Sequence, residues 1–206
     1  MMIRSLEVGA IGANCYLVWC KETGEGVVID PGDNAERIVQ IIKDEKISVK
    51  HIINTHGHID HIGANGGVKE ATGASILIHE LDAPTLLDAE DNLSEWMGLN
   101  VTGPPADQAL RNGDRISVGK TVELVVIHTP GHTKGGICLK CGDIIFTGDT
   151  LFAGSVGRSD FPGGSARQLI DSIHERLLCF PDDTTIYPGH GPYSTIGYER
   201  ENNPFL

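Results

Sequence analysis

The stretch Thr55–His61, THGHIDH, constrains the fold more than any other part of the chain. It places three histidines and an aspartate directly after KHIIN, residues 50–54, whose apolar β-branched side chains predict a buried strand. These four side chains are typical metal ligands. Because they follow one strand, the fold must bring their partners to the same sheet edge from other parts of the chain.

A second feature is a pattern that occurs twice: a strand ending in aspartate, a helix, and a strand followed by histidine. Its members are Asp30, a helix over 34–46 and His56 in the first half, and Asp149, a helix over 165–179 and His190 in the second. We therefore predict two related halves, each a sheet with its helices outside. Packed face to face, the sheets form a four-layer αββα sandwich in which both sets of strand ends meet at one edge.

The first predicted helix follows from the spacing of its apolar residues. Ile38, Ile41 and Ile42 lie at the i, i+3 and i+4 intervals of an amphipathic helix. Asn34 precedes this run and is expected to cap the first turn.

Further ligand-type residues follow other strands, each beside a glycine that allows close backbone approach. Together the candidate metal ligands are His56, His58, Asp60, His61, His132, Asp149 and His190. Seven ligands exceed the need of one tetrahedral ion. If Asp149 bridges, each of two ions receives four protein ligands and a shared hydroxide makes five. Nitrogen and oxygen ligands suit two divalent ions, of zinc first, with iron or manganese as alternatives.

Composition limits the partners and the location. At 206 residues and 40% hydrophobic content, the chain can bury the core of a single domain over residues 1–206. A formal net charge of −12 argues against a nucleic-acid partner, which calls for a basic face. No apolar run is long enough for a membrane span or a leader, and five cysteines suit a reducing compartment, so we expect a cytoplasmic protein. The sequence leaves the oligomeric state open.

The motifs THGHIDH, TPGHT, FTGDT and YPGHG, in this order, resemble those of the metallo-β-lactamase superfamily. The resemblance implies the αββα fold and divides the ligands between two ions. It assigns His56, His58 and His132 to the first ion, Asp60, His61 and His190 to the second, and Asp149 to both.

Within that superfamily, GDTLFAGSVGRSDFPGG at 148–164 and ERENNPF at 199–205 most resemble the glyoxalase II group, the hydroxyacylglutathione hydrolases. The likeness is to the short single-domain form, which has no C-terminal helical domain for holding glutathione. It implies hydrolysis of a small thioester such as a 2-hydroxyacyl-glutathione. Arg158 and Asp160 stand where the group has lysine and tyrosine, so we expect Arg158 to contact an anionic part of the substrate.

The ligand set also predicts a mechanism. Two divalent ions outweigh the charges of Asp60, Asp149 and a bridging hydroxide, so the site favours a developing oxyanion. The ions lower the pKa of bound water towards ~7, which makes hydroxide available to attack a thioester carbonyl. Asp60 is expected to orient this nucleophile while binding the second ion. Asp30 is our candidate for a carboxylate that orients a ligand histidine.

Other functions fit parts of the sequence. A persulfide dioxygenase of the same superfamily would use one iron, held by His56, His132 and Asp149, and it shares the GRSDF stretch. A non-catalytic metal-binding module would be expected to have lost ligands, and none is missing here. An antibiotic-hydrolysing enzyme with a cysteine ligand is disfavoured, because Asp149 occupies that position.

Residues 88–112 have a role that the sequence leaves open. Leu93, Trp96 and Met97 lie at helical spacing, which predicts a short helix in a loop over the metal edge. Core packing and a cover over the substrate are the two interpretations.

Overall fold

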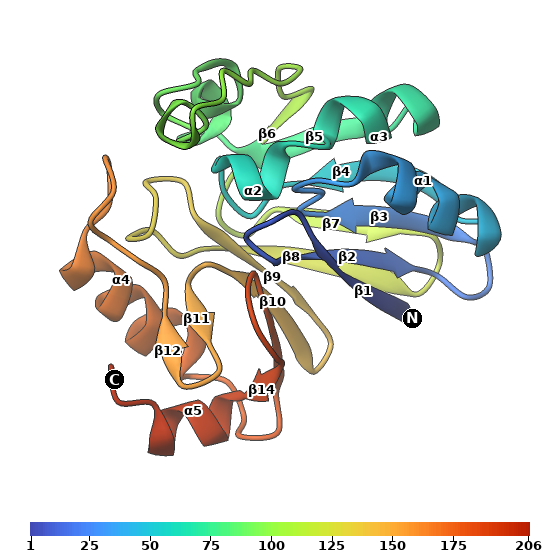
Figure 1. Ribbon diagram of the computed structural model, residues 1–206. Helices are drawn as coiled ribbons and strands as arrows, with labels where there is room; N and C mark the ends of the chain where they lie inside the picture. The colour runs from blue at the N-terminus through green and yellow to red at the C-terminus, as the bar shows by residue number, and fades with distance from the viewer.

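The computed structural model describes all 206 residues, and the N-terminal half forms its first sheet. The strands of this sheet, in spatial order, are β1 (Met2–Val8), β2 (Ala13–Trp19), β3 (Glu25–Ile29), β4 (Ser48–Ile53), β5 (Ser75–His79) and β6 (Gln108–Leu110). Strands β3 to β6 run parallel to one another, whereas β1, β2 and β3 pair antiparallel. The parallel strands therefore end at one shared edge (Figure 1).

The second sheet comes from the C-terminal half. Its strands, in spatial order, are β14 (Ser194–Thr195), β13 (Thr185–Pro188), β10 (Ile144–Gly148), β9 (Ile137–Cys141), β8 (Val122–His128) and β7 (Arg115–Val118). Strands β10 and β13 are parallel and end at the same edge of the sheet. A candidate ligand follows each of them, Asp149 after β10 and His190 after β13. A separate hairpin, β11 (Leu151–Phe152) and β12 (Ser155–Val156), follows β10 directly.

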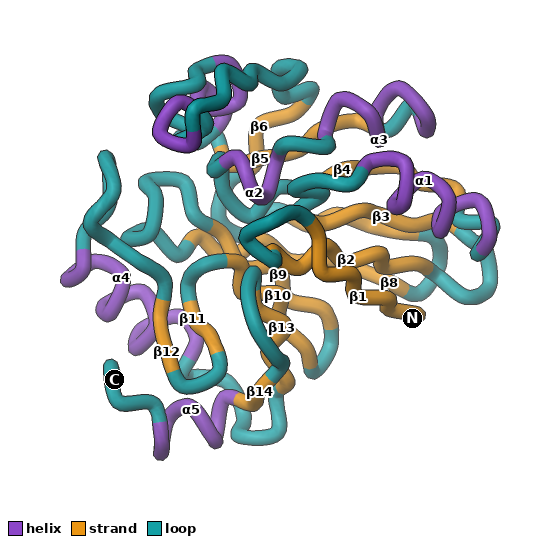
Figure 2. The backbone as a smooth tube through the Cα atoms, viewed as in Figure 1, coloured by secondary structure: helices purple, strands orange, loops and turns teal.

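Helices cover the outer faces of the two sheets, as Figure 2 shows in purple around the orange strands. The helices are α1 (Ala35–Asp44), α2 (Ile59–Ile62), α3 (Asn65–Thr72), α4 (Ala166–Ser172), which continues into a π-helical turn at Ile173–Leu177, and α5 (Ile196–Asn202). Short 3₁₀ turns occupy Ala83–Leu87 and Glu95–Met97. Helices α1 and α3 pack on the first sheet, and α4 and α5 pack on the second. The predicted four-layer αββα sandwich is confirmed.

Alternating apolar side chains hold the layers together. In β2, Leu17 packs toward the helices and its neighbour Tyr16 faces the other sheet, because successive strand residues point to opposite faces. In β10, Ile145 packs toward α4 and Phe146 faces the first sheet. The rings of Tyr16 and Phe146 meet between the sheets at 5.1 Å. Each such buried side chain contributes about 1.5–3 kcal/mol.

Backbone contacts fasten the two sheets at the edge that carries the candidate ligands. The Asn14 N–H donates to the carbonyl of Gly189 at 2.7 Å, and Ala13 forms an isolated antiparallel bridge with His190. The start of β2 in one half therefore fixes the position of a candidate ligand from the other half.

One local prediction was wrong, and a second is met only in part. Asn34 lies at the N-cap position of α1 but makes no side-chain cap, because its Oδ1 accepts a hydrogen bond from the Gly9 N–H at 3.0 Å instead. The predicted helix through Leu93, Trp96 and Met97 is only a 3₁₀ turn, because Leu93 adopts a left-handed φ of 67° that interrupts it. No helix has both the length and the apolar character needed to cross a membrane.

Candidate metal centre

Three histidines converge at the shared edge of the sheets. His56 follows β4, His58 lies at the start of α2, and His132 follows β8. Nε2 of His132 lies 3.2 Å from Nε2 of His56 and 2.9 Å from Nδ1 of His58. Ligands of a tetrahedral zinc ion at about 2.0–2.1 Å lie about 3.3 Å apart. The three nitrogens are therefore spaced as ligands of one ion.

A second group lies beside the first. Helix α2 carries Asp60 and His61, and the loop after β13 carries His190. The Oδ2 atom of Asp60 lies 3.2 Å from Nε2 of His190 and 3.6 Å from Nε2 of His61. The His61 side chain is fully buried, whereas 24% of the His190 side chain is exposed. This half of the site is thus open to solvent on one side.

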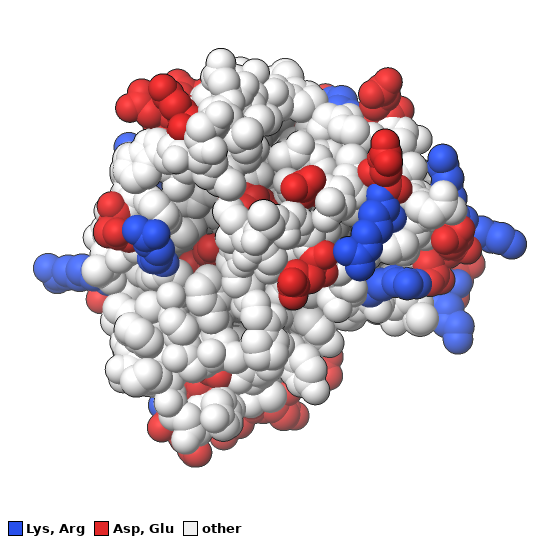
Figure 3. All heavy atoms as spheres, in the orientation of Figure 1, with Lys and Arg blue, Asp and Glu red and all other residues white.

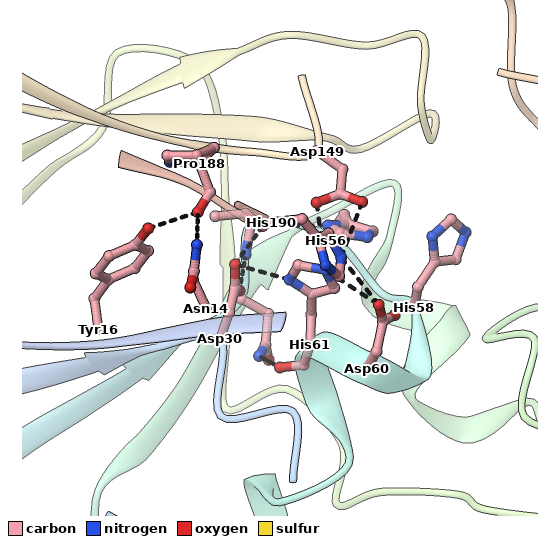
Figure 4. Close-up of polar contacts among 12 residues, drawn as sticks. Asn14, Tyr16, Asp30, His56, His58, Asp60, His61, Asp149, Pro188 and His190 are labelled. Carbon is pink, nitrogen blue, oxygen red and sulfur yellow. Dashed lines mark hydrogen bonds and ion pairs between the residues drawn. The ribbon is translucent and has the colours of Figure 1, made fainter. Parts of the chain in front are cut away.

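Asp149 lies between the two groups, at the end of β10 (Figure 4). Its Oδ2 is 3.6 Å from Nε2 of both His132 and His190, and its Oδ1 is 3.4 Å from Nε2 of His61. A Cβ at Gly189 would lie only 2.1 Å from Oδ1 of Asp149, so glycine is needed for this approach. The structure thus brings all seven predicted ligand residues together.

The donor set fits two cations. Nε2 of His61 and Oδ1 of Asp149 are buried but have no hydrogen-bond partner in the protein, which is rare for buried polar atoms. Three groups of three residues each place one ligand atom within 4.8 Å of the others. Histidine nitrogens with carboxylate oxygens are ligands that zinc, iron and manganese all accept.

Burial and neighbouring charges keep the histidines of the first group neutral, the form that binds a metal ion. Burial, followed by the neighbouring histidines, holds the pKa of His56 well below its usual value. Burial and the nearby His132 lower the pKa of His58 to about 3. Neutral imidazoles with free lone pairs are the form that binds metal ions.

The second group has the opposite electrostatics. Burial would lower the pKa of His61, but three nearby carboxylates outweigh burial and raise it to about 10. Burial would raise the pKa of Asp60, but His61 and His190 hold it below its usual range. Clustered carboxylates give this half an excess of negative charge, which a divalent cation would neutralise.

Asp30, the predicted orienting carboxylate, lies directly behind the second group. Its Oδ1 accepts from the Thr55 N–H and its Oδ2 from the Thr55 hydroxyl, both at 2.7 Å. The same Oδ2 lies 3.1 Å from Nδ1 of His61. When a metal ion replaces the proton on Nε2, an Nδ1–H bonded to this carboxylate would keep the ring oriented with Nε2 directed at the centre. Asp30 also has a left-handed φ of 51°, a conformation that clusters at functional sites.

Asp82 is a second buried carboxylate, and no sequence pattern indicated its role. Its oxygens accept from the Gly57 N–H at 3.2 Å, the Thr133 hydroxyl at 2.7 Å and the Gly135 N–H at 2.6 Å. Gly57 lies between His56 and His58, and Thr133 follows His132. Asp82 therefore ties together the two loops that supply the first group of ligands.

Replacing Asp82 with alanine is expected to weaken binding of the first metal ion by about 10–100-fold, as for other groups that position ligands. The reason is that both ligand loops lose their common acceptor while the ligands stay. Chelator competition measures the affinity, and Asp183→Ala, at an exposed aspartate, is the control. Unchanged metal affinity with normal folding would show that the loops hold their shape without Asp82.

Two side chains of β2 also escaped prediction. Asn14 Nδ2 donates to the carbonyls of Pro188 at 3.0 Å and Gly191 at 2.9 Å, and the Tyr16 hydroxyl donates to Pro188 at 2.6 Å. Figure 4 shows both side chains directed at Pro188. These contacts hold the loop that carries His190.

Glu199 and Asn203 form a buried link that we call the hairpin clamp. Oε2 of Glu199 accepts from the Gly154 N–H and from Asn203 Nδ2, both at 2.8 Å. Asn203 Nδ2 also donates to the carbonyl of Ser155 at 3.0 Å. The hairpin β11–β12 is thereby fixed, and the ring of its Phe152 lies 6.0 Å from that of His190.

A cavity of about 530 Å³ opens over the candidate ligands. Its floor contains His58, Asp60, His132, Asp149 and His190. Its walls and rim are Ile11, Ile59, Leu93, Trp96, Met97, Phe152, Ser155, Val156, Arg158 and Phe161. Residues 88–112, whose role the sequence left open, therefore contribute both to packing and to the cavity border. Leu93 is buried, whereas Trp96 and Met97 border the cavity.

The αββα sandwich with this cluster of ligands at its edge defines a metal-dependent hydrolase. The chain belongs to the metallo-beta-lactamase superfamily, which its residues 8–190 match. This confirms the family indicated by the motifs.

Two curated relatives are hydroxyacylglutathione hydrolases. Hydroxyacylglutathione hydrolase GloC of Haemophilus influenzae is 37% identical over 100% of this chain and 98% of its own length. A hydroxyacylglutathione hydrolase of Polaromonas sp. is 38% identical over 85% of this chain and 60% of its own length.

Solved structures share the fold along nearly the whole of this chain. The BLEG-1 B3 metallo-beta-lactamase aligns with a TM-score of 0.94 and 36% identity, over 100% of this chain and 99% of its own. TTHA1623 in a di-iron-bound form aligns with a TM-score of 0.88 and 37% identity, over 98% and 100%. ETHE1 from Myxococcus xanthus aligns with a TM-score of 0.82 and 32% identity, over 99% and 84%.

Proposed function

We propose that this protein hydrolyses small thioesters, such as 2-hydroxyacyl thioesters, at a centre of two divalent metal ions. The observation that carries the proposal is the complete second group, Asp60, His61 and His190, beside the complete first group. Asp149 spans both groups at distances of 3.4 to 3.6 Å. The full-length likeness to hydroxyacylglutathione hydrolase GloC supports the thioester class.

The residues have distinct roles in this reaction. When bound, two divalent ions supply Lewis acidity and lower the pKa of a shared water towards ~7. Asp60, whose pKa is held below its usual range, would be ionised and would orient the attacking water toward the acyl carbon while helping to hold the second ion. The largely apolar walls of the cavity limit the contact of other water with the reacting group.

The leaving group explains why no further acid is needed. A thiol has an unperturbed pKa of about 8.5, so it departs as a thiolate without a proton. The cavity lining holds no lysine, glutamate or tyrosine that could protonate a poorer leaving group. This lining suits thioesters better than amides.

The test separates hydrolysis from oxygen chemistry. Protein loaded with zinc alone, under anaerobic conditions, is expected to release free thiol from 2-hydroxyacyl thioesters. Iron-loaded protein with glutathione persulfide is expected to consume no oxygen. Oxygen uptake with persulfide, together with intact thioesters, would replace the hydrolase proposal by a single-iron dioxygenase.

The dioxygenase is the second candidate because ETHE1 from Myxococcus xanthus is similar along the chain and because GRSDF lies at 157–161. Such an enzyme needs one iron with open positions for oxygen and substrate. Asp60, His61 and His190 would then have no ligand role, although His61 is fully buried and oriented by Asp30. We therefore place the dioxygenase second.

Metal content gives an independent prediction. Because seven ligand residues form two adjacent groups, purified protein stripped by a chelator and reloaded is expected to hold close to two ions per chain. Elemental analysis by plasma mass spectrometry, against a quantified protein concentration, measures the ratio. Saturation at one ion would count against the binuclear centre.

A further inference from the structure

We propose that the cavity over the metal centre selects thioesters whose thiol-derived part is uncharged and apolar, in preference to anionic thioesters such as those of glutathione. This inference rests on the proposed function and names the substrate class within it. The lining of the cavity, the pairing of its arginine and the character of its rim carry it.

The cavity contains one basic side chain outside the metal-binding histidines. Of its fifteen lining residues, eight are hydrophobic, and Arg158 is the lone arginine or lysine. Glutathione carries two carboxylates, which a specific site would meet with cationic or amide groups. The chain as a whole has a net charge of −12, so its long-range field repels anions.

From the sequence we expected Arg158 to contact an anionic part of the substrate, but in the structure its side chain is already paired within its own loop. Its Nε and NH2 donate to the two carboxylate oxygens of Asp160 at 2.9 and 2.7 Å, a bidentate pair. Its guanidinium also lies over the ring of Phe161, 4.1 Å from the centroid. Both side chains are largely exposed, so the pair is weak, but an anionic substrate still has to compete with a carboxylate tethered two residues away instead of meeting a free cation.

The backbone of the same residue is fixed by the metal centre. The carbonyl of Arg158 accepts from Nδ1 of His132 at 2.5 Å. Arg158 therefore cannot move away from Asp160 as a whole residue without disturbing a candidate ligand. Only its side chain is free to change partners.

The outer part of the cavity is apolar. Ile11, Trp96 and Met97 form an exposed border that we call the apolar rim, and 63% of Trp96 is accessible to solvent. The Trp96 ring lies edge to face with that of Phe161 at 6.1 Å. On the face in Figure 3 most atoms are uncharged, acidic groups lie in and beside the hollows near the centre, and most basic groups lie toward the edges. Clustered exposed apolar groups mark a binding surface.

The position of the reacting bond indicates which end of the substrate lies at the apolar rim, namely the thiol-derived part. The acyl carbon must reach the ligands on the cavity floor, so the two ends of the substrate extend along the walls. In hydrolysis, water oxygen bonds to the acyl carbon, the C–S bond breaks, and sulfur keeps the electron pair. A 2-hydroxyacyl group is small, so the longer thiol-derived chain reaches the apolar rim.

The test compares two thioesters with the same acyl group. We expect zinc-loaded protein to hydrolyse S-lactoyl-N-hexanoylcysteamine with a kcat/KM roughly tenfold or more above that for S-lactoylglutathione. Trp96→Ala is expected to raise KM for the cysteamine thioester more than it lowers kcat. Asp160→Asn, which frees Arg158, is expected to raise kcat/KM for S-lactoylglutathione. Asp183→Asn, at a distant exposed aspartate, is the control and should change neither substrate.

Binding gives a readout that does not depend on turnover. The chain has two tryptophans, Trp96 on the rim and Trp19, which is only 8% exposed. The thioether S-methyl-N-hexanoylcysteamine is expected to change the Trp96 fluorescence at lower concentration than S-methylglutathione, and Trp96→Phe should remove the change.

The outcomes distinguish the two levels of the proposal. If S-lactoylglutathione is hydrolysed as well as the cysteamine thioester, or if S-methylglutathione binds as tightly, the selectivity is wrong while the hydrolase function stands. If the two-metal protein cleaves neither thioester, the hydrolase function falls and the selectivity with it.

Discussion

Replacing Asp149 with alanine is expected to abolish thioester hydrolysis and to weaken binding of both metal ions. Its carboxylate lies 3.6 Å from Nε2 of His132 and of His190, so its loss removes a ligand from each group. Metal ions contribute several kcal/mol of transition-state stabilisation, and each 1.36 kcal/mol is a factor of ten in rate. We therefore expect kcat/KM to fall by roughly 10³-fold or more.

His190→Ala is the matched comparison, because His190 belongs to the second group alone and is partly exposed. This variant should lose the second ion and keep the first at nearly unchanged affinity. Dialysis against graded chelator, followed by metal analysis, separates the two patterns. If the Asp149→Ala protein keeps both ions at the affinity of the unmodified protein, Asp149 does not bridge them.

Replacing Asp30 with asparagine is expected to weaken the second ion about 10–100-fold while preserving the shape of the side chain. Oδ2 of Asp30 accepts from the Thr55 hydroxyl and faces Nδ1 of His61. An amide nitrogen there would face the Nδ1–H, so the imidazole would move its proton to Nε2. Nε2 is the atom directed at the metal centre, and a protonated nitrogen cannot bind a metal.

Calorimetric titration of each variant with zinc measures this effect. Asp183→Asn has the same chemistry at an exposed site and should bind zinc as the unmodified protein does. Thermal unfolding of the metal-free proteins checks the structure, since loss of a buried acceptor alone costs about 1–3 kcal/mol. Equal affinities for both ions in a folded Asp30→Asn protein would mean that Asp30 serves packing only.

The sequence predicted the ligands because each follows a strand that its own residues identify. The apolar run before His56 and the run before Asp149 both mark buried strands, and parallel strands end at a shared edge. Once two such halves pack face to face, their strand ends must meet. Alternation in β2 and β10 then accounts for the layers without further information.

The supporting groups could not be predicted because their roles depend on contacts between distant segments. In the sequence, Asp82 resembles the many surface aspartates that follow a short strand. It is buried only because the loops at Gly57 and Gly135 pack around it. Asn34 looked like a helix cap, but the turn at Gly9 competes for its side-chain oxygen. Leu93 lies at helical spacing from Trp96 and Met97, and no neighbouring residue type indicates that its backbone is left-handed.

The hairpin clamp has a consequence for exchanging parts between relatives. Glu199 in α5 holds Gly154 of the hairpin, across 45 residues of sequence, and Asn203 holds Ser155. The stretches GDTLFAGSVGRSDFPGG and ERENNPF are thus two sides of one contact. A chimera that takes the β11–β12 hairpin from a relative with another substrate must also take that relative's last helix. Without it, the new hairpin would lack the hydrogen bonds that Glu199 and Asn203 make here.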